Sequence, residues 1–275
     1  MMKKPLWLLG WLLLGLPVAG GADFLQLTGN FIQGSLITGR TEPGTRVLLN
    51  GQPLRVSPAG VFVIGFDRDA GAQARLEITY ANGAQEIRVL TIIPRSYAIQ
   101  RIEGLAEERV TPPTEVLERI RQETALVARV REHDGEQPYF LSGFRWPVVG
   151  RVSGVYGSQR ILNGQPRQPH NGVDITAPAG TPVLAPADGV VALANPDMYF
   201  GGSTLIVDHG HGLYSSFLHL KDIYVTVGQS VKQGDTIASV GATGRATGPH
   251  LHWGMNWFQQ RIDPALLVPP MERQE

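Results

Sequence analysis

The chain has 275 residues, and its 24 basic and 24 acidic side chains give a formal net charge of zero at pH 7. This balance gives no sign of nucleic-acid binding, for which a basic excess is typical. Cysteine is absent, so disulfides and thiolate metal ligands are excluded, and any metal must be held by histidine and carboxylate side chains. The 33 glycines and 20 prolines predict many turns and a mainly β fold.

Residues 1–22 have the layout of a secretory signal peptide. Lys3 and Lys4 precede an apolar run over residues 5–19, which is shorter than the ~20 residues that a membrane-spanning helix needs. Small residues follow, and we predict cleavage near Ala22. The chain is therefore expected to be exported and to act in the periplasm or cell envelope. Contact with the membrane is expected only through this segment, and only if it is not cleaved.

Residues 23–95 alternate short apolar strands with turns. Asn50-Gly51 and Asn82-Gly83 each separate two apolar runs, which is a strong hairpin signal. The pattern predicts a small antiparallel β domain, a sandwich that resembles bacterial immunoglobulin-like modules. This segment contains no histidine, and we see no catalytic constellation in it.

Residues 96–143 are interpreted as a connector. Apolar residues at helical spacing predict an amphipathic helix over about residues 114–132, which we interpret as a spacer packed on one neighbour. His133, at its exit, is expected to be solvated or to act as a charge at the helix C-terminus. From residue 144 to residue 268, short β runs alternate with glycine and proline turns and predict a second, all-β domain. Residues 269–275 are expected to form a tail.

The second domain ends with two histidines, His250 and His252, separated by one apolar residue. In a strand, alternate side chains leave the same face, so both imidazoles are expected in one space, while Leu251 and Trp253 face the other way. Only seven histidines occur in the whole chain. Two of them on one strand face therefore indicate a functional site.

Two further segments offer partners for this pair. His170 and Asp174 are four residues apart, and a shared strand face or a bend at Asn171-Gly172 could bring them together. Taken alone this spacing is a weak metal signal. His219 ends an apolar run in which Ser215, Phe217 and His219 are expected to share a face. An isolated histidine in such a strand is more often a hydrogen-bonded core residue.

A second His-x-His pair, His209 and His211, is interpreted as a decoy. Glycines on both sides of His211 predict a hairpin turn, and a turn holds ligand rotamers poorly. We expect His211 to be exposed to solvent and His209 to line a cleft at most.

Taken in order, the His170-x-x-x-Asp174 spacing, the Phe217-Leu-His219 run and residues 241–252 resemble the three motifs of the lysostaphin-type, LytM-like zinc peptidoglycan endopeptidases, peptidase family M23. Residues 180–189 and 231–237 match as well, and the similarity covers about residues 144–265. The resemblance implies an antiparallel β domain of the duplicated hybrid type. It also implies peptidoglycan as the substrate, with divisome proteins or other wall hydrolases as possible partners.

The resemblance further implies that His170, Asp174 and His252 bind Zn²⁺ and that His219 and His250 are catalytic. All five positions are filled here, which favours an active enzyme over relatives that have lost ligands. The chain has no His-Glu-x-x-His helix, so His219 or His250 must accept the proton of the attacking water and stabilise the oxyanion.

The substrate groove is expected near Tyr199, Phe200 and Gly201, where the aromatic rings form walls and the glycine allows close backbone approach. Residues 158–167 lie upstream of the His170 motif. Asn163 in this segment could occupy the water site of a latent form, although a polar turn at the groove edge is the simpler interpretation.

Two other functions compete with this one. Residues 185–189 and 232–235 also resemble sugar-permease phosphocarriers and biotinyl-type barrels, but a phosphocarrier is cytoplasmic and needs no aspartate ligand, so the signal segment and Asp174 argue against it. The alternative is a non-catalytic or latent regulator that binds the wall or activates another wall hydrolase. The non-catalytic form of this alternative predicts neither zinc nor cleavage.

Overall fold

The structure is a computed structural model that describes residues 24–104 and 112–271. The signal segment predicted for residues 1–22 lies outside these ranges, as does most of the predicted tail. Within the described ranges, no helix combines the length and apolar character needed to cross a membrane.

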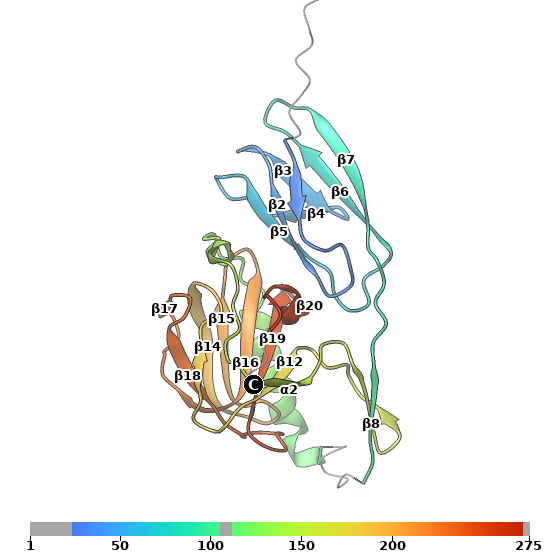
Figure 1. Ribbon diagram of the computed structural model, residues 1–275. Helices are drawn as coiled ribbons and strands as arrows, with labels where there is room; N and C mark the ends of the chain where they lie inside the picture. The colour runs from blue at the N-terminus through green and yellow to red at the C-terminus, as the bar shows by residue number, and fades with distance from the viewer. Residues whose placement is uncertain (1–23, 105–111, 272–275) are drawn as a thin grey trace, which may run out of the picture.

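Seven strands near the N-terminus form two antiparallel sheets (Figure 1). Their bounds are β1 Gln26–Thr28, β2 Leu36–Arg40, β3 Arg46–Leu49, β4 Gln52–Leu54, β5 Val61–Gly65, β6 Gln73–Thr79 and β7 Gln85–Thr91. One sheet has the order β1-β2-β5 and the other the order β4-β3-β6-β7. The predicted Asn50-Gly51 turn joins β3 to β4, and both residues have a positive φ, as a two-residue hairpin requires.

The core of this sandwich follows from strand alternation. In β6, Ala74, Leu76 and Ile78 are buried, whereas the residues between them are at least partly accessible. The opposing sheet contributes Ile37 and Phe62, both fully buried. Apolar residues at every second position thus place one face of each sheet in a common interior.

A connecting segment follows, with β8 at Ile99–Ile102, a 3₁₀ turn at Thr114–Val116, helix α2 at Leu117–Val130 and a second 3₁₀ turn at Tyr139–Ser142. The expected helix is therefore present, slightly shorter than the sequence indicates. Its apolar side, Leu126, Val127 and Val130, packs against a buried cluster that contains Tyr214.

The rest of the chain forms a ten-stranded antiparallel sheet and a small hairpin. The bounds are β9 Arg151–Gly154, β10 Gln159–Leu162, β11 Gln165–Pro166, β12 Val173–Thr176, β13 Pro182–Leu184, β14 Gly189–Met198, β15 Gly202–Asp208, β16 Leu213–Ile223, β17 Ser230–Val231, β18 Thr236–Val240, β19 His250–Trp257 and β20 Gln260–Ile262, with a 3₁₀ turn at Pro264–Leu266. The main path of the sheet runs β17-β14-β15-β16-β19-β12-β9, and β13, β18 and β20 pair at its sides. The β10–β11 hairpin stands apart and pairs in parallel with β8.

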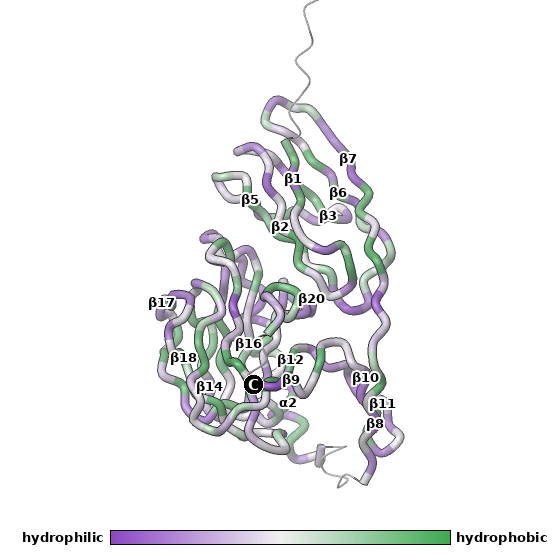
Figure 2. The backbone as a smooth tube through the Cα atoms, in the orientation of Figure 1, coloured by the Kyte–Doolittle hydropathy of each residue, from purple (hydrophilic) through white to green (hydrophobic). Residues whose placement is uncertain are grey.

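The large sheet is buried on both faces near its middle. All seven residues of β15 are buried, and Trp253 of β19 and Phe217 of β16 are fully buried on one side. Helix α2 covers part of the other side, because it packs on Tyr214. Figure 2 shows the hydrophobic colour mainly along the strands and the hydrophilic colour mainly at the turns.

The N-terminal sandwich contacts the large sheet through β5, which lies against β19 and β20. Contact is close at Gly65, where an added Cβ would come within 2.6 Å of the Trp257 Cβ atom. Arg95 Nη1 also forms an ion pair of 2.9 Å with Asp263 Oδ2, and the Asp263 side chain is almost fully buried. These contacts fix the sandwich at one end of the sheet, as Figure 1 shows.

Candidate metal centre and active site

Strand pairing brings Asp174 and His252 together. Strands β12 and β19 are antiparallel, and Asp174 lies directly opposite His252. Residues directly opposite each other project from the same face, so the carboxylate and the imidazole share one space. Leu251 and Trp253, on the other face of β19, are fully buried in the core. The alternation predicted for this strand is confirmed.

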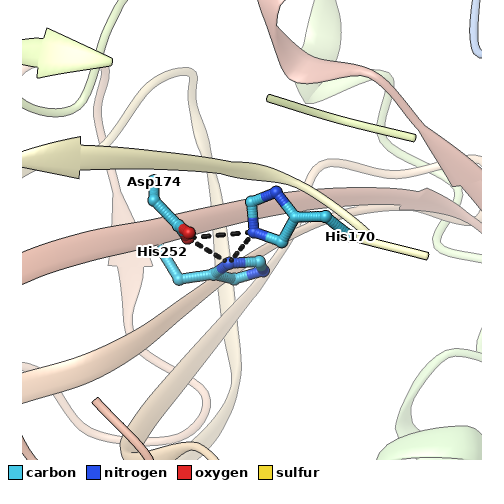
Figure 3. A group of neighbouring side chains, drawn as sticks. All are labelled: His170, Asp174 and His252. Atoms are coloured by element: carbon cyan, nitrogen blue, oxygen red, sulfur yellow. Dashed lines mark hydrogen bonds and ion pairs between the residues drawn. The ribbon is translucent and has the colours of Figure 1, made fainter. Parts of the chain in front are cut away.

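His170 completes a group of three ligand atoms (Figure 3). It lies in the bend before β12, and its Nε2 is 3.0 Å from Asp174 Oδ1 and 3.1 Å from His252 Nδ1. His252 Nδ1 is 2.8 Å from the same Asp174 oxygen. The bend, rather than a shared strand face, therefore brings His170 and Asp174 together.

These three atoms fit a tetrahedral metal. Bonds of about 2.0–2.1 Å at the tetrahedral angle place zinc ligand atoms about 3.3 Å apart, and the distances here are a few tenths of an ångström shorter. His170 Nδ1 lies 3.0 Å from the carbonyl oxygen of Val155. Because a carbonyl only accepts, Nδ1 carries the proton, and the Nε2 lone pair is free for a metal. Two imidazole nitrogens and one carboxylate oxygen are suitable zinc ligands.

The charge state of the group also suits a cation. Burial acts to raise the pKa of the Asp174 carboxyl, but its close contacts with the rings of His170 and His252 outweigh burial and hold that pKa well below its usual range. Burial lowers the pKa of His252 despite the nearby carboxylate. The structure thus favours an ionised aspartate and a neutral histidine, the forms that bind metals.

His219 reaches the same space through a β-bulge. Between β15 and β16, Ser203 pairs with Leu220 and Leu205 pairs with Phe217, so β16 has one extra residue in this stretch. His219 lies in it with a φ of 63°. Its ring centroid is 4.8 Å from that of His250.

The prediction that Phe217 and His219 share a face is therefore wrong. Phe217 pairs directly with Trp253 and belongs to the core face. The extra residue of the bulge turns His219 to the opposite face, beside His250 and His252.

His219 and His250 present their Nε2 atoms as acceptors. Nδ1 of His219 is 2.9 Å from the carbonyl oxygen of Thr243, and Nδ1 of His250 is 2.8 Å from that of Gly248. Each Nδ1 must therefore carry the proton, which leaves the Nε2 lone pair free. His250 Nε2 lies 3.9 Å from Asp174 Oδ1. Burial lowers the pKa of His219 to about 4, so this imidazole is neutral at pH 7.

One of the predicted groove residues, Gly201, contacts His219 directly. The carbonyl oxygen of Gly201 accepts a hydrogen bond of 2.8 Å from the His219 backbone N–H. The rings of Tyr199 and Phe200 meet edge to face, with centroids 4.9 Å apart. Asn163 lies in the turn between β10 and β11, with a φ of 46°. The polar turn expected at this position is present.

The prediction for the second His-x-His pair is partly wrong. His209 and His211 do lie in the turn between β15 and β16, but both are buried. His209 Nδ1 is 2.7 Å from the carbonyl oxygen of Asp188, and its Nε2 is 2.8 Å from Ser215 Oγ. His211 packs edge to face on Phe140. The 3₁₀ turn at Tyr139–Ser142 covers this loop, a tertiary contact that local glycine content does not reveal.

Sequence reasoning missed several residues around the site. Arg160 Nη2 lies 3.2 Å from Asp174 Oδ2 and so contacts the carboxylate from the side away from His170. Gly154 and Gly172 leave space for Asp174 and His252: a Cβ on Gly154 would lie 2.4 Å from Asp174 Oδ2, and one on Gly172 would lie 2.9 Å from His252 Nε2. The only sequence signal for this lack of a side chain is the position of Gly172 between His170 and Asp174.

This antiparallel β domain brings two histidines and an aspartate together, with two further histidines beside them, which is the site of a metal-dependent hydrolase. The model of peptidase family M23 matches residues 168–264. A crystal structure assigned to peptidase M23 from Pseudomonas aeruginosa is 30% identical in sequence, with a TM-score of 0.66, and the match covers 86% of this chain and 94% of that one. The chain belongs to peptidase family M23.

Curated relatives match a little less than half of this chain. The peptidoglycan DD-endopeptidase ShyA of Vibrio cholerae is 40% identical over 138 residues, which cover 46% of this chain and 32% of the relative. The cell division protein DipM of Caulobacter vibrioides is 35% identical over 132 residues, which cover 46% of this chain and 21% of that protein. The matches thus span only a fifth to a third of the length of these relatives.

Proposed function

We propose that this protein is an exported zinc-dependent endopeptidase that hydrolyses peptide bonds in peptidoglycan cross-links. The observation that carries the proposal is the convergence of His170, Asp174 and His252 to within 3.1 Å of one another, with two further imidazoles beside them. Zinc at this position would polarise the scissile carbonyl and supply a nucleophile at neutral pH.

Side chains of the protein would then accept the proton of the attacking water and stabilise the charge that develops. His219 and His250 each hold the proton on Nδ1, so each has an Nε2 acceptor available to take a proton from water. Once protonated, the same nitrogen becomes a donor that can stabilise an oxyanion or protonate the leaving amine. The backbone contacts of His219 with Gly201 and Thr243 fix the ring in place for this role.

The names of the relatives support the choice of substrate. ShyA is a peptidoglycan DD-endopeptidase and DipM is a cell division protein. From these relatives we infer that the present chain acts on peptidoglycan of the cell wall. We also infer a role in wall remodelling or cell division. Gly201, which contacts His219, and the preceding Tyr199 and Phe200 would form one wall of the groove. The N-terminal sandwich and α2 would hold the sheet and this wall in position.

The test is zinc analysis of the purified protein followed by digestion of isolated peptidoglycan and mass spectrometry of the products. The proposal expects about one zinc per chain and new amine and carboxylate ends at cross-links. Zinc without cleavage would favour the alternative, a regulator of another wall hydrolase. Absence of both zinc and cleavage would also contradict the proposed metal site.

A further inference from the structure

Two arginines meet where the end of helix α2 lies on the large sheet. Arg131 directly follows α2, and its Nη2 donates a hydrogen bond of 2.9 Å to Ser216 Oγ on β16. Arg261 lies on β20, and its Nη1 donates a hydrogen bond of 3.2 Å to Asn256 Oδ1 on β19. Both acceptors are uncharged, so neither hydrogen bond neutralises a guanidinium group.

Strand register places these two acceptors on one face of the sheet. Ser216 lies directly opposite Gly254, and Asn256 is two residues further along β19, so Ser216 and Asn256 are diagonal neighbours about 7–8 Å apart. Gln259 Nε2 donates a hydrogen bond of 3.1 Å to the carbonyl oxygen of Ala128, which joins the β19–β20 turn to the last turn of α2. The two guanidinium groups therefore approach one space, one from the helix and one from the sheet.

The positive charge in this space has no anionic partner. The Arg131 residue is only 5% exposed, and its Nε atom is buried without a hydrogen-bond partner. In the part of the chain that the structure describes, neither Arg131 nor Arg261 forms an ion pair. Burial, and next the charge of Arg261, lower the pKa of the Arg131 guanidinium to about 9, so it still carries its charge at pH 7.

The end of the helix does not balance this charge. The C-terminus of α2 offers roughly half a negative charge, against two full positive charges. A buried charge without a partner is strongly unfavourable, and buried charges in proteins are therefore paired. The arrangement of Arg131 and Arg261 thus calls for an anion.

The donors around this space indicate what kind of anion fits. Arg131 Nε is free to donate, and the Ser216 hydroxyl, which accepts from Arg131, has no acceptor for its own proton among the described residues. Guanidinium groups bind phosphate-like oxyanions through several charge-assisted hydrogen bonds. Because Arg131 is covered, only a small ion has room beside it, and the partly exposed Arg261 marks the side of entry.

We propose that Arg131, Arg261 and Ser216 bind a small inorganic oxyanion of the phosphate or sulfate class between α2 and the large sheet. The ion would join the end of α2 to β16 and β20, beside the strand that carries His252. None of the three residues belongs to the metal centre. Binding here requires neither zinc nor peptide cleavage, so it stands or falls independently of the proposed function.

The test is a calorimetric titration of inorganic phosphate into the full-length, zinc-loaded protein in chloride buffer at pH 7 and constant ionic strength. We expect a Kd of about 1 mM or tighter. Phosphate can also bind zinc, so the titration is repeated after zinc is removed with a chelator, and binding at the arginine pair should persist. Sulfate, titrated in parallel, should bind the same site and lose affinity in the same variants.

Arg131→Met and Arg261→Met should each weaken phosphate binding about 10–100-fold in the zinc-free protein, the usual effect of losing a hydrogen bond from a charged group. Ser216→Ala should weaken it about 2–10-fold. Methionine replaces an unpaired buried charge with an apolar side chain of similar length, so the fold should be retained. Arg129→Met is the matched control, because Arg129 is an exposed arginine on the same helix, and it should bind phosphate as the wild type does.

Thermal unfolding gives a second measurement. Phosphate at ten times its Kd should raise the Tm of the wild type by a few degrees relative to chloride, and should leave the Tm of Arg131→Met unchanged. Equal phosphate affinity in the zinc-free wild type and both methionine variants would overturn the inference and indicate an adventitious ion only. Loss of all phosphate binding on removal of zinc would overturn it too, because the ion would then belong to the metal centre.

Discussion

The Nδ1–H of His219 donates a hydrogen bond of 2.9 Å to the carbonyl oxygen of Thr243. This bond ties the bulge in β16 to the loop before β19. The same loop continues into His250, whose Nδ1–H bonds the carbonyl oxygen of Gly248. Both imidazoles are thus held by main-chain oxygens and present Nε2 to the site. Zinc binding and acid–base catalysis are assigned to different histidines, so mutations can separate the two properties.

Replacing His219 or His250 by alanine should leave zinc bound and reduce kcat by about 10²–10⁴-fold, because each removes an acid–base group and no ligand. Replacing His170 or His252 should remove the zinc. Metal analysis and peptidoglycan digestion of the four variants test this. His133→Ala, which changes an exposed histidine outside the site, should keep both metal and activity. Zinc loss in the His250 variant with retention in the His252 variant would reverse the assignment.

Gly202→Ala should damage the position of His219. Gly202 has a φ of 61°, and a Cβ there would lie 2.3 Å from Thr243 Oγ1 and 2.5 Å from the Gly244 nitrogen. The loop that holds His219 must move, and displacements of about 1 Å at an active site can cost 10²-fold in rate. We expect zinc to remain bound while kcat falls to that extent.

Gly228→Ala is the matched control for Gly202→Ala. Gly228 has a φ of 85°, but a Cβ there meets no atom within 4 Å. Both variants therefore carry the backbone strain of a positive φ, roughly 1 kcal/mol. Equal losses of activity in the two variants would show that backbone strain, and not the Thr243 loop, is responsible.

The ion pair between Arg95 and Asp263 should contribute to the docking of the N-terminal sandwich. The Asp263 side chain is 5% exposed, so Arg95→Ala leaves a buried carboxylate without its charged partner. We expect the free energy of unfolding to fall by about 1–3 kcal/mol, measured by denaturant titration. Arg121→Ala breaks an exposed pair with Glu118 and should change it by less than about 1 kcal/mol. A similar loss in both variants would argue against a role for burial.

Stability should fall on acidification through His209. Burial lowers the pKa of this imidazole from 6.5 to about 4. Between pH 6.5 and pH 4 the unfolded chain therefore binds a proton that the folded chain does not, so the free energy of unfolding decreases as the pH falls through this window. The full effect is about 3 kcal/mol.

The measurement is the free energy of unfolding as a function of pH, with a chelator present so that metal release does not contribute. His209→Gln should have a shallower slope than the wild type between pH 6.5 and pH 4. His133→Gln, at an exposed position, should keep the wild-type slope. Parallel curves for the wild type and His209→Gln would rule out this origin of the acid sensitivity.

Much of the fold could be predicted because its signals are local. Asn50, Gly51 and Gly83 adopt the positive φ values that turns use, and the hairpins expected at both Asn-Gly sequences are present. The helix was predicted from apolar spacing, and only its ends differ by two or three residues. The pairing of β8 with the β10–β11 hairpin was not predicted, since parallel pairing across about 60 residues leaves no local pattern.

The sequence by itself determined that His250 and His252 would share a face, because a strand alternates by covalent geometry. It also placed His170 four residues from Asp174, but it left a shared strand face and a bend both open, and the structure shows the bend. Only the tertiary structure decided the rest. The bulge that turns His219 away from Phe217 depends on the register with β15, and the burial of His211 depends on a segment 70 residues earlier. The approach of Arg160 to Asp174 likewise depends on how distant segments pack, because long-range contacts follow from the whole fold and not from the spacing of neighbours.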